Sequence, residues 1–133
     1  MITINLSFFN QNDILKNHIK LWKSYSDDVK NKFTFFIIDD CSKISALEVL
    51  KEIDLSDINL HIYRVEDDLI CNIAGVRNLG ATECNTEWMV ILDMDTMIDE
   101  IMAKEIIMLA KNNEGSNVYK FNRKVLNNTK HPK

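Results

Sequence analysis

The sequence contains little glycine, proline or cysteine. Only three Gly and one Pro occur in 133 residues, so most turns must be built from Asn, Asp and Ser, which tolerate turn conformations. The three cysteines are an odd number, and none of them stands in a C-x-x-C pair. This usage argues against a disulfide framework or a zinc site and favours reduced thiols in a cytoplasmic protein.

Excess positive charge and long apolar runs are also missing. The formal net charge is -4, so the chain lacks the basic field by which many proteins hold nucleic acid. No apolar run approaches the ~18–20 residues of a membrane-spanning helix, and residues 1–9 are strand-like and do not fit a secretory signal. We therefore expect a cytoplasmic protein with no membrane span and no nucleic-acid partner.

The hydrophobic pattern predicts alternating strands and helices. Hydrophobic residues make up 46% of the chain, which is enough for one domain with a buried core. Alternating or continuous apolar runs, typical of strands, are interleaved with runs of helical spacing. The predicted strands are residues 2–8, 33–38, 59–65, 88–93 and 117–125, and the predicted helices are residues 13–26, 44–53, 72–84 and 99–111.

This alternation predicts the fold class. Strands that alternate with helices form right-handed crossovers and a mostly parallel sheet with helices on both faces. The fold class is therefore α/β, a Rossmann-like three-layer α/β/α sandwich. We expect residues 1–133 to form a single domain and residues 127–133 to be a disordered tail.

Several residues predict helix starts and core positions. Ser45 with Glu48 fits a capping box, and Asp99 fits an N-cap. His18 lies on the apolar stripe of the first predicted helix, so we expect a half-buried core residue and not a ligand. Trp22 lies on the same stripe and is expected to be a packing residue and not a platform for a sugar.

Polar side chains gather where three of the predicted strands end. Asp39 and Asp40 follow one buried strand, Asp93 and Asp95 end another, and Ser7 lies near the end of the first. Parallel α/β sheets bind their ligands beyond the carboxyl ends of the strands. We therefore expect these side chains to line one edge of the sheet.

Asp93 and Asp95 form a D-x-D pattern that can bind a metal ion. Two carboxylates at this spacing, where a strand breaks into a turn, can both reach one divalent ion. Oxygen ligands suit Mg²⁺ or Mn²⁺, which keep several waters and share their shell with substrate phosphates. The alternative is that the two residues only terminate a strand and cap the following turn. Taken alone, the D-x-D pattern favours this alternative.

Other known D-x-D and nucleotide sites fit the sequence less well. An EF-hand loop requires Glu at its twelfth position, where this chain has Lys104. A phosphatase of the haloacid dehalogenase type needs Thr or Val at the place of Met97 and further residues well downstream, so a fragment of one is a remote alternative. The Gly-rich loops of a Rossmann dinucleotide site and of a P-loop are absent.

Several segments taken together resemble the GT-A-fold glycosyltransferases of family 2. "ITINLSFFNQND" is similar to the opening strand of that family, and "FTFFIIDDCS" is similar to its Asp-Asp segment. "NIAGVRNLGATECNTEWMVILDMD" is similar to its Arg-Asn segment followed by a strand that ends in D-x-D. The resemblance covers residues 1 to about 110. It implies the donor-binding, N-terminal part of a GT-A-like nucleotide-sugar-binding domain, apparently truncated.

The resemblance implies roles in binding a nucleotide-diphospho-sugar, typically a UDP-sugar. Asp40 would accept a hydrogen bond from the base. Ser7 and Phe9 would lie at the base, with Phe9 stacking on it. Arg77 would reach the base or the diphosphate.

For the D-x-D residues, the resemblance implies a metal-dependent diphosphate site. Asp93 would contact the ribose or a metal-bound water, and Asp95 would coordinate the Mg²⁺ or Mn²⁺ that bridges the diphosphate. The chain departs from the family at Cys41, which replaces a Gly after the Asp pair. The turn there must therefore form with a less permissive residue.

The resemblance also implies an acceptor-binding half that is missing here. That half and the catalytic base lie in the ~100 or more residues that follow D-x-D in a domain of ordinary size, and the final segment, "YKFNRKVLNNTKHPK", offers no Asp or Glu. We therefore expect a glycosyltransferase-like domain that acts on an unknown acceptor with a C-terminal half or as a homo-oligomer. The alternative is a non-catalytic module that binds a nucleotide or a partner protein.

Overall fold

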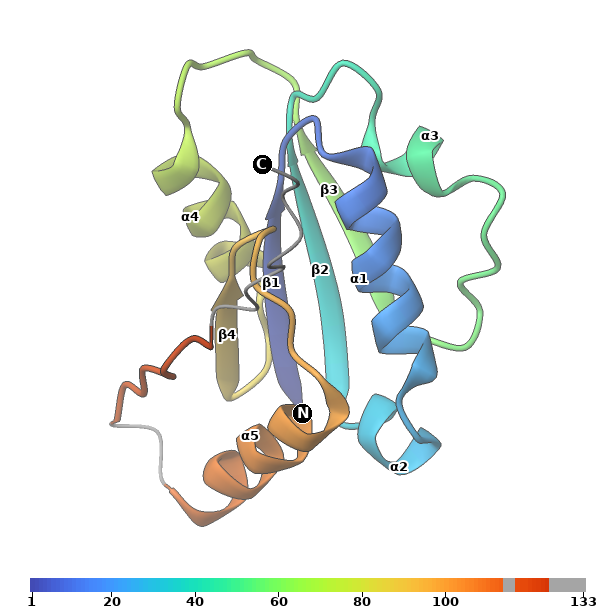
Figure 1. Cartoon of the computed structure of the whole chain (residues 1–133). Helices are drawn as coiled ribbons and strands as arrows, with labels where there is room; N and C mark the ends of the chain where they lie inside the picture. Colours follow the sequence, from blue (N-terminus) through green and yellow to red (C-terminus); the bar gives the residue numbers. More distant parts are fainter. Residues whose placement is uncertain (114–116, 125–133) are drawn as a thin grey trace, which may run out of the picture.

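Parallel strands form the centre of the protein. The structure, a computed structural model, describes residues 1–113 and 117–124. Within them one sheet has the strand order β3-β2-β1-β4, with every pair parallel, so the predicted parallel sheet is confirmed (Figure 1). The strands are β1 (Ile2–Phe8), β2 (Phe33–Asp40), β3 (Leu60–Val65) and β4 (Trp88–Leu92).

Helices cover both faces of this sheet, as predicted. Helices α1 and α3 lie on one face and α4 lies on the other, which gives three layers (Figure 1). The helices are α1 (Asn12–Ser24), α2 (Asp27–Lys30), α3 (Ala46–Leu50), α4 (Ile73–Glu83) and α5 (Glu100–Asn112). No helix in the described part of the chain is both long enough and apolar enough to span a membrane.

The helix starts follow the predicted local signals in two places. The hydroxyl of Ser45 accepts a hydrogen bond from the backbone N–H of Glu48 at 3.2 Å. The carboxylate of Asp99 accepts one from the backbone N–H of Met102 at 2.8 Å. Both side chains satisfy N–H groups that the helix itself leaves without a partner. Helix α3 is shorter than the predicted 44–53.

Two other predictions differ from the structure. The predicted helix 13–26 ends at Ser24, because Tyr25 and Ser26 are extended before the short helix α2. The predicted strand 117–125 is wrong over residues 117–124, which form no strand. Phe121 packs against the main core instead, and the ring of Tyr119 lies 6.0 Å from that of Trp88, whereas Val118 is exposed. The predicted tail, residues 127–133, lies outside the described residues.

The main core lies between the sheet and α1. Alternate residues of β1, starting with Ile2, face this core together with Trp22, whose ring stacks on Phe35 at 4.5 Å. Trp22 is therefore a packing residue, as predicted. His18 is fully buried in this layer and not half-buried as predicted, because its ring meets a backbone carbonyl that satisfies one nitrogen.

Helix α4 approaches the other face of the sheet closely at Gly80. A Cβ atom added to Gly80 would lie 2.1 Å from Nδ2 of Asn5, which is fully buried on β1. Gly75, in the same helix, would meet the side chain of Asn72 at 2.1 Å, but Asn72 is partly exposed and can rotate. The missing side chain of Gly80 thus sets the distance between α4 and the sheet.

We predict that Gly80→Ala lowers the free energy of unfolding by about 1–3 kcal/mol, the usual cost of overpacking a core. The matched variant Gly75→Ala should stay within about 1 kcal/mol of wild type, because Ala favours the helix by a similar amount over Gly. Urea denaturation followed by circular dichroism measures both. Adding Asn5→Ala to Gly80→Ala should recover most of the loss, and equal stabilities of the two glycine variants would contradict this account of the packing.

Candidate functional site

The two adjacent aspartates at the end of β2 point to opposite faces of the sheet. Asp39 is fully buried on the α1 and α3 face. Its carboxylate accepts hydrogen bonds from the backbone N–H groups of Ser42 and Ala46, both at 2.9 Å, and pairs with Arg64 Nη1 at 2.7 Å. Asp39 therefore holds the turn into α3 and does not line the ligand edge, in contrast to the sequence prediction.

Asp40 lies on the other face, the one covered by α4. Its Oδ1 atom is buried and has no hydrogen-bond partner within the described residues. The same is true of the hydroxyl of Ser7 and of Nε of Arg77. Buried polar atoms are normally paired. Asn5 Oδ1, His18 Nδ1 and Trp22 Nε1 are also buried and unpaired within the described residues, so the atoms of Asp40, Ser7 and Arg77 belong to a wider set. Within this set, the atoms of Asp40, Ser7 and Arg77 are the ones on residues that the sequence assigned to a nucleotide.

Asp93 stands between two arginines. It directly follows β4, whose last residue, Leu92, is in register with Leu6 of β1. Arg77 Nη2 lies 2.8 Å from one carboxylate oxygen of Asp93, and Arg123 Nη2 lies 3.5 Å from the other. The structure thus joins Arg77 and Asp93 in one ion pair, and their roles toward a nucleotide stay predictions.

Arg123 is a neighbour of Asp93 that the sequence did not predict. It belongs to the basic C-terminal segment, where a strand over 117–125 was expected. The local pattern contains no signal that would place it at Asp93, because the contact joins residues far apart in the sequence.

Asp95 and Phe9 are the most accessible of the predicted residues. Asp95 is exposed, and its only hydrogen bond within the described residues comes from the hydroxyl of Thr96 at 3.3 Å. The backbone N–H of Thr96 donates to the carbonyl of Asp93 at 3.0 Å and so closes a turn around the D-x-D residues. Phe9 is half exposed at the end of β1, so its ring is free to stack on a ligand.

Two strained turns flank Phe9 and Asp40. Asn10 and Cys41 both have positive φ angles, 53° and 57°, a conformation that non-glycine residues rarely adopt. The turn after Asp40 therefore forms with Cys41 in place of the family's Gly, as the sequence predicted. Asn10 joins the two loops, because its N–H donates to the hydroxyl of Ser42 at 3.0 Å and its Oδ1 accepts from the N–H of Lys43 at 2.8 Å.

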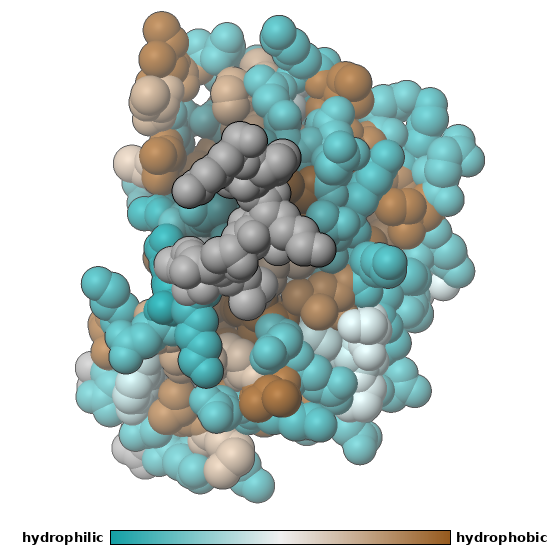
Figure 2. All heavy atoms as spheres, viewed as in Figure 1, coloured by the Kyte–Doolittle hydropathy of each residue, from teal (hydrophilic) through white to brown (hydrophobic). Residues whose placement is uncertain are grey.

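An exposed apolar group lies beside this edge. The loop between β3 and α4 arches past the carboxyl ends of the strands (Figure 1), and Figure 2 shows hydrophobic residues gathered there, at the upper left of the molecule. Leu69, Ile70 and Ile73 are all more than half exposed. This loop presents apolar side chains to solvent next to the polar strand ends.

Of the two D-x-D carboxylates, that of Asp95 is the one exposed to a metal ion, and such an ion would be shared with a ligand. Within residues 1–113 and 117–124, no three His, Cys, Asp or Glu side chains are grouped so that they could hold an ion by themselves. Mg²⁺ is usually held by one or two carboxylates together with phosphate oxygens and waters. Asp95 has a free carboxylate for this purpose, whereas both oxygens of Asp93 face arginines.

The parallel sheet with acidic strand ends at one edge defines a GT-A-like α/β domain. Residues 1–121 match the sequence model of the family described as "Glycosyltransferase like family 2". The chain therefore belongs to this glycosyltransferase family, as the resemblance in the sequence implied. No curated protein matches the chain.

Solved structures support the same fold. S. aureus TarS 1-349 matches with a TM-score of 0.67 and 15% sequence identity, covering 84% of this chain and 32% of that one. TarS 1-349 in complex with UDP-GlcNAc matches with a TM-score of 0.66 and 16% identity over 84% and 31% of the two chains. The complex with UDP matches with a TM-score of 0.61 and 17% identity over 84% and 32%. This chain thus spans about a third of the length of these proteins.

We predict that the two adjacent aspartates differ sharply in their effect on stability. Asp39→Ala should lower the free energy of unfolding by about 2–4 kcal/mol, because it removes a buried carboxylate with three partners. Asp40→Ala should change it by less than about 1 kcal/mol, since no protein group loses a hydrogen bond to Oδ1. Thermal and urea denaturation of the two variants provide the measurement. Similar losses for both would show that the faces of β2 are assigned wrongly.

Proposed function

We propose that this chain binds a nucleotide-diphospho-sugar, specifically a UDP-sugar, and presents it for glycosyl transfer. Three observations support the proposal. The chain belongs to a glycosyltransferase family, its fold matches a protein that has been solved with UDP and with UDP-GlcNAc, and unpaired polar atoms occur on the residues that the family motif assigns to the nucleotide. The family match carries most weight, because it extends over residues 1–121.

The nucleoside would occupy the edge beyond β1 and β2. Asp40 would accept a hydrogen bond from the base, and its unpaired Oδ1 atom supplies the acceptor. Ser7 would offer its hydroxyl beside it, and Phe9 would stack its exposed ring on the base, a contact worth about 0.5–1.5 kcal/mol beyond the buried area. Each of these residues would gain a contact that it lacks in the free protein.

The diphosphate would lie toward β4. Arg77 and Arg123 would provide positive charge to an otherwise acidic chain, and Asp93 holds both guanidinium groups in place. Asp93 would in turn contact the ribose or a metal-bound water, and Asp95 would hold the Mg²⁺ or Mn²⁺ ion. When bound, such an ion stabilises the negative charge of the departing diphosphate. Arg77 already points at Asp93, so its direction is set before a ligand arrives.

A non-catalytic role is the second candidate, and one observation favours it for these residues alone. Of the acidic residues after the D-x-D turn, Asp99 caps α5 and Glu100 bonds to Ser26 and pairs with Lys104. Neither is free to act as a base toward an acceptor. Glu105 is exposed on α5, so transfer would require this residue, or groups from a further part of the protein or from a second copy.

Other aspects of the proposal follow from the family and the composition. The family match favours glycosyl transfer over the haloacid-dehalogenase-type alternative. The three cysteines are all free, which supports a cytoplasmic location. The acceptor stays unidentified, and a C-terminal half or homo-oligomer stays a prediction.

We predict that UDP binds and that Mn²⁺ strengthens its binding by at least about tenfold, as expected for an ion that neutralises a diphosphate. Asp95→Ala should remove most of this gain and leave the metal-free affinity unchanged. Isothermal titration calorimetry with and without Mn²⁺ measures both. The matched control Glu105→Ala removes one exposed carboxylate from α5 and should behave as wild type.

Two results would count against the proposal. Absence of UDP binding in either condition would exclude a nucleotide site in this chain. Binding without hydrolysis or transfer of the sugar from UDP-GlcNAc would leave the non-catalytic module as the better description.

A further inference from the structure

The segment between β4 and α5 is held at two backbone carbonyls, one by a side chain of α1 and one by the residue that follows α1. His18 Nε2 lies 2.8 Å from the carbonyl oxygen of Met94, across 76 positions of sequence. Directly after the end of α1, the hydroxyl of Tyr25 donates a hydrogen bond to the backbone carbonyl of Ile98. Met94 is the residue between Asp93 and Asp95, so the first of these contacts reaches the middle of the D-x-D pattern itself.

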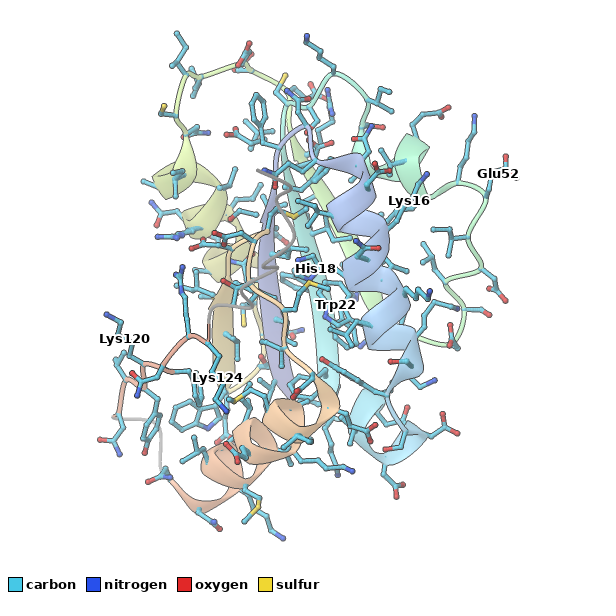
Figure 3. The ribbon with its side chains drawn as sticks, viewed as in Figure 1. Lys16, His18, Trp22, Glu52, Lys120 and Lys124 are labelled. Carbon is cyan, nitrogen blue, oxygen red and sulfur yellow. The ribbon has the colours of Figure 1, made fainter. Side chains whose placement is uncertain are left out.

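The nitrogen of His18 is the hydrogen-bond donor in this contact. A carbonyl oxygen only accepts hydrogen bonds, so Nε2 must carry the hydrogen. Burial lowers the pKa of His18 below its ordinary value, which keeps the ring neutral. The ring is fully buried, with Nδ1 unpaired within the described residues and its centre 5.7 Å from that of Trp22. Figure 3 shows both side chains on α1 beside the sheet.

Packing alone does not explain a histidine at this position. The neighbouring residues of the buried stripe are Leu15, Ile19 and Trp22, and an apolar side chain would fill the space without bringing a polar ring into the core. Burying polar nitrogens costs free energy unless they are hydrogen-bonded, and here only one of the two is. That one bond goes to the carbonyl of Met94, which lies in a turn outside any helix or strand.

The contact fixes which way the D-x-D residues face. With its carbonyl held toward α1, Met94 buries its side chain in the main core at 8% exposure. The aspartates on either side then point elsewhere, Asp93 to Arg77 and Asp95 to solvent. The N–H of Thr96, bonded to the carbonyl of Asp93 at 3.0 Å, closes the turn behind them.

We propose that His18 is a positioning residue for the metal-binding carboxylate, acting through its hydrogen bond to the carbonyl of Met94 to hold Asp95 toward the ligand. The proposal rests on the proposed function, in which Asp95 binds a divalent ion together with UDP. His18 touches neither the ion nor the nucleotide. Its effect is therefore expected on the gain from the metal and not on binding of the nucleoside.

Calorimetry with UDP, with and without Mn²⁺, tests this role. In His18→Leu, the Mn²⁺-dependent gain in UDP affinity should fall by about fivefold, the effect of one lost hydrogen bond, while the metal-free affinity stays at the wild-type value. His18→Gln places an N–H donor at a similar reach and should restore most of the gain. The control Leu50→Ala destabilises the buried face of α3 and should leave the gain unchanged.

A second measurement needs no ligand. Amide hydrogen exchange at Thr96 reports on the turn directly. Protection of the Thr96 amide from exchange should fall in His18→Leu and recover in His18→Gln. It should persist in Leu50→Ala when this variant is compared with His18→Leu at the same free energy of unfolding. Unchanged protection at Thr96 in His18→Leu overturns the proposal for His18 whether or not UDP binds. If wild type shows no gain from Mn²⁺, the proposed metal site fails, and the positioning role of His18 toward it fails as well.

Discussion

The pairing of β1 with both of its neighbours determines where the candidate site residues at the strand ends lie. Leu6 is in register with Ile37 on one side and with Leu92 on the other. Side chains alternate between the two faces of a sheet, so this register sends the side chains of Ser7 and Asp40 to the face of α4. A slip of one residue would reverse these directions. The apolar residues of β1, buried against α1, prevent that slip.

Because of the same alternation, the two aspartates of β2 lie on opposite faces of the sheet. Asp39 has a structural role, and Asp40 has the proposed role toward the ligand. Asp39 satisfies the backbone of the turn into α3 and pairs with Arg64. Asp40, one residue later, keeps a buried, unpaired oxygen on the other face. The proposed pairing of Asp40 with a base follows from this difference.

The sequence predicted the parallel sheet of the first four strands and two helix caps, because these depend on local pattern, but it missed α2 and added a last strand that residues 117–124 do not form. Ser45 and Asp99 are examples, since each cap involves residues three positions apart. It did not predict that Asp39 would be buried, because a carboxylate at a strand end can serve either face. His18 and Arg123 were missed for another reason. Their partners in the D-x-D turn are distant in sequence, and only the folded chain brings them together.

The central claim is that the α4 side of the carboxyl edge binds the nucleotide. Backbone amide chemical shifts, recorded while UDP and Mg²⁺ are added to the labelled protein, test this claim most directly. The account predicts that the shifted amides gather at residues 7–10, at Asp40 and Cys41, and over residues 93–96. Shifts confined to α2 and α5, or to the face of α3, would contradict it, as would the absence of any change.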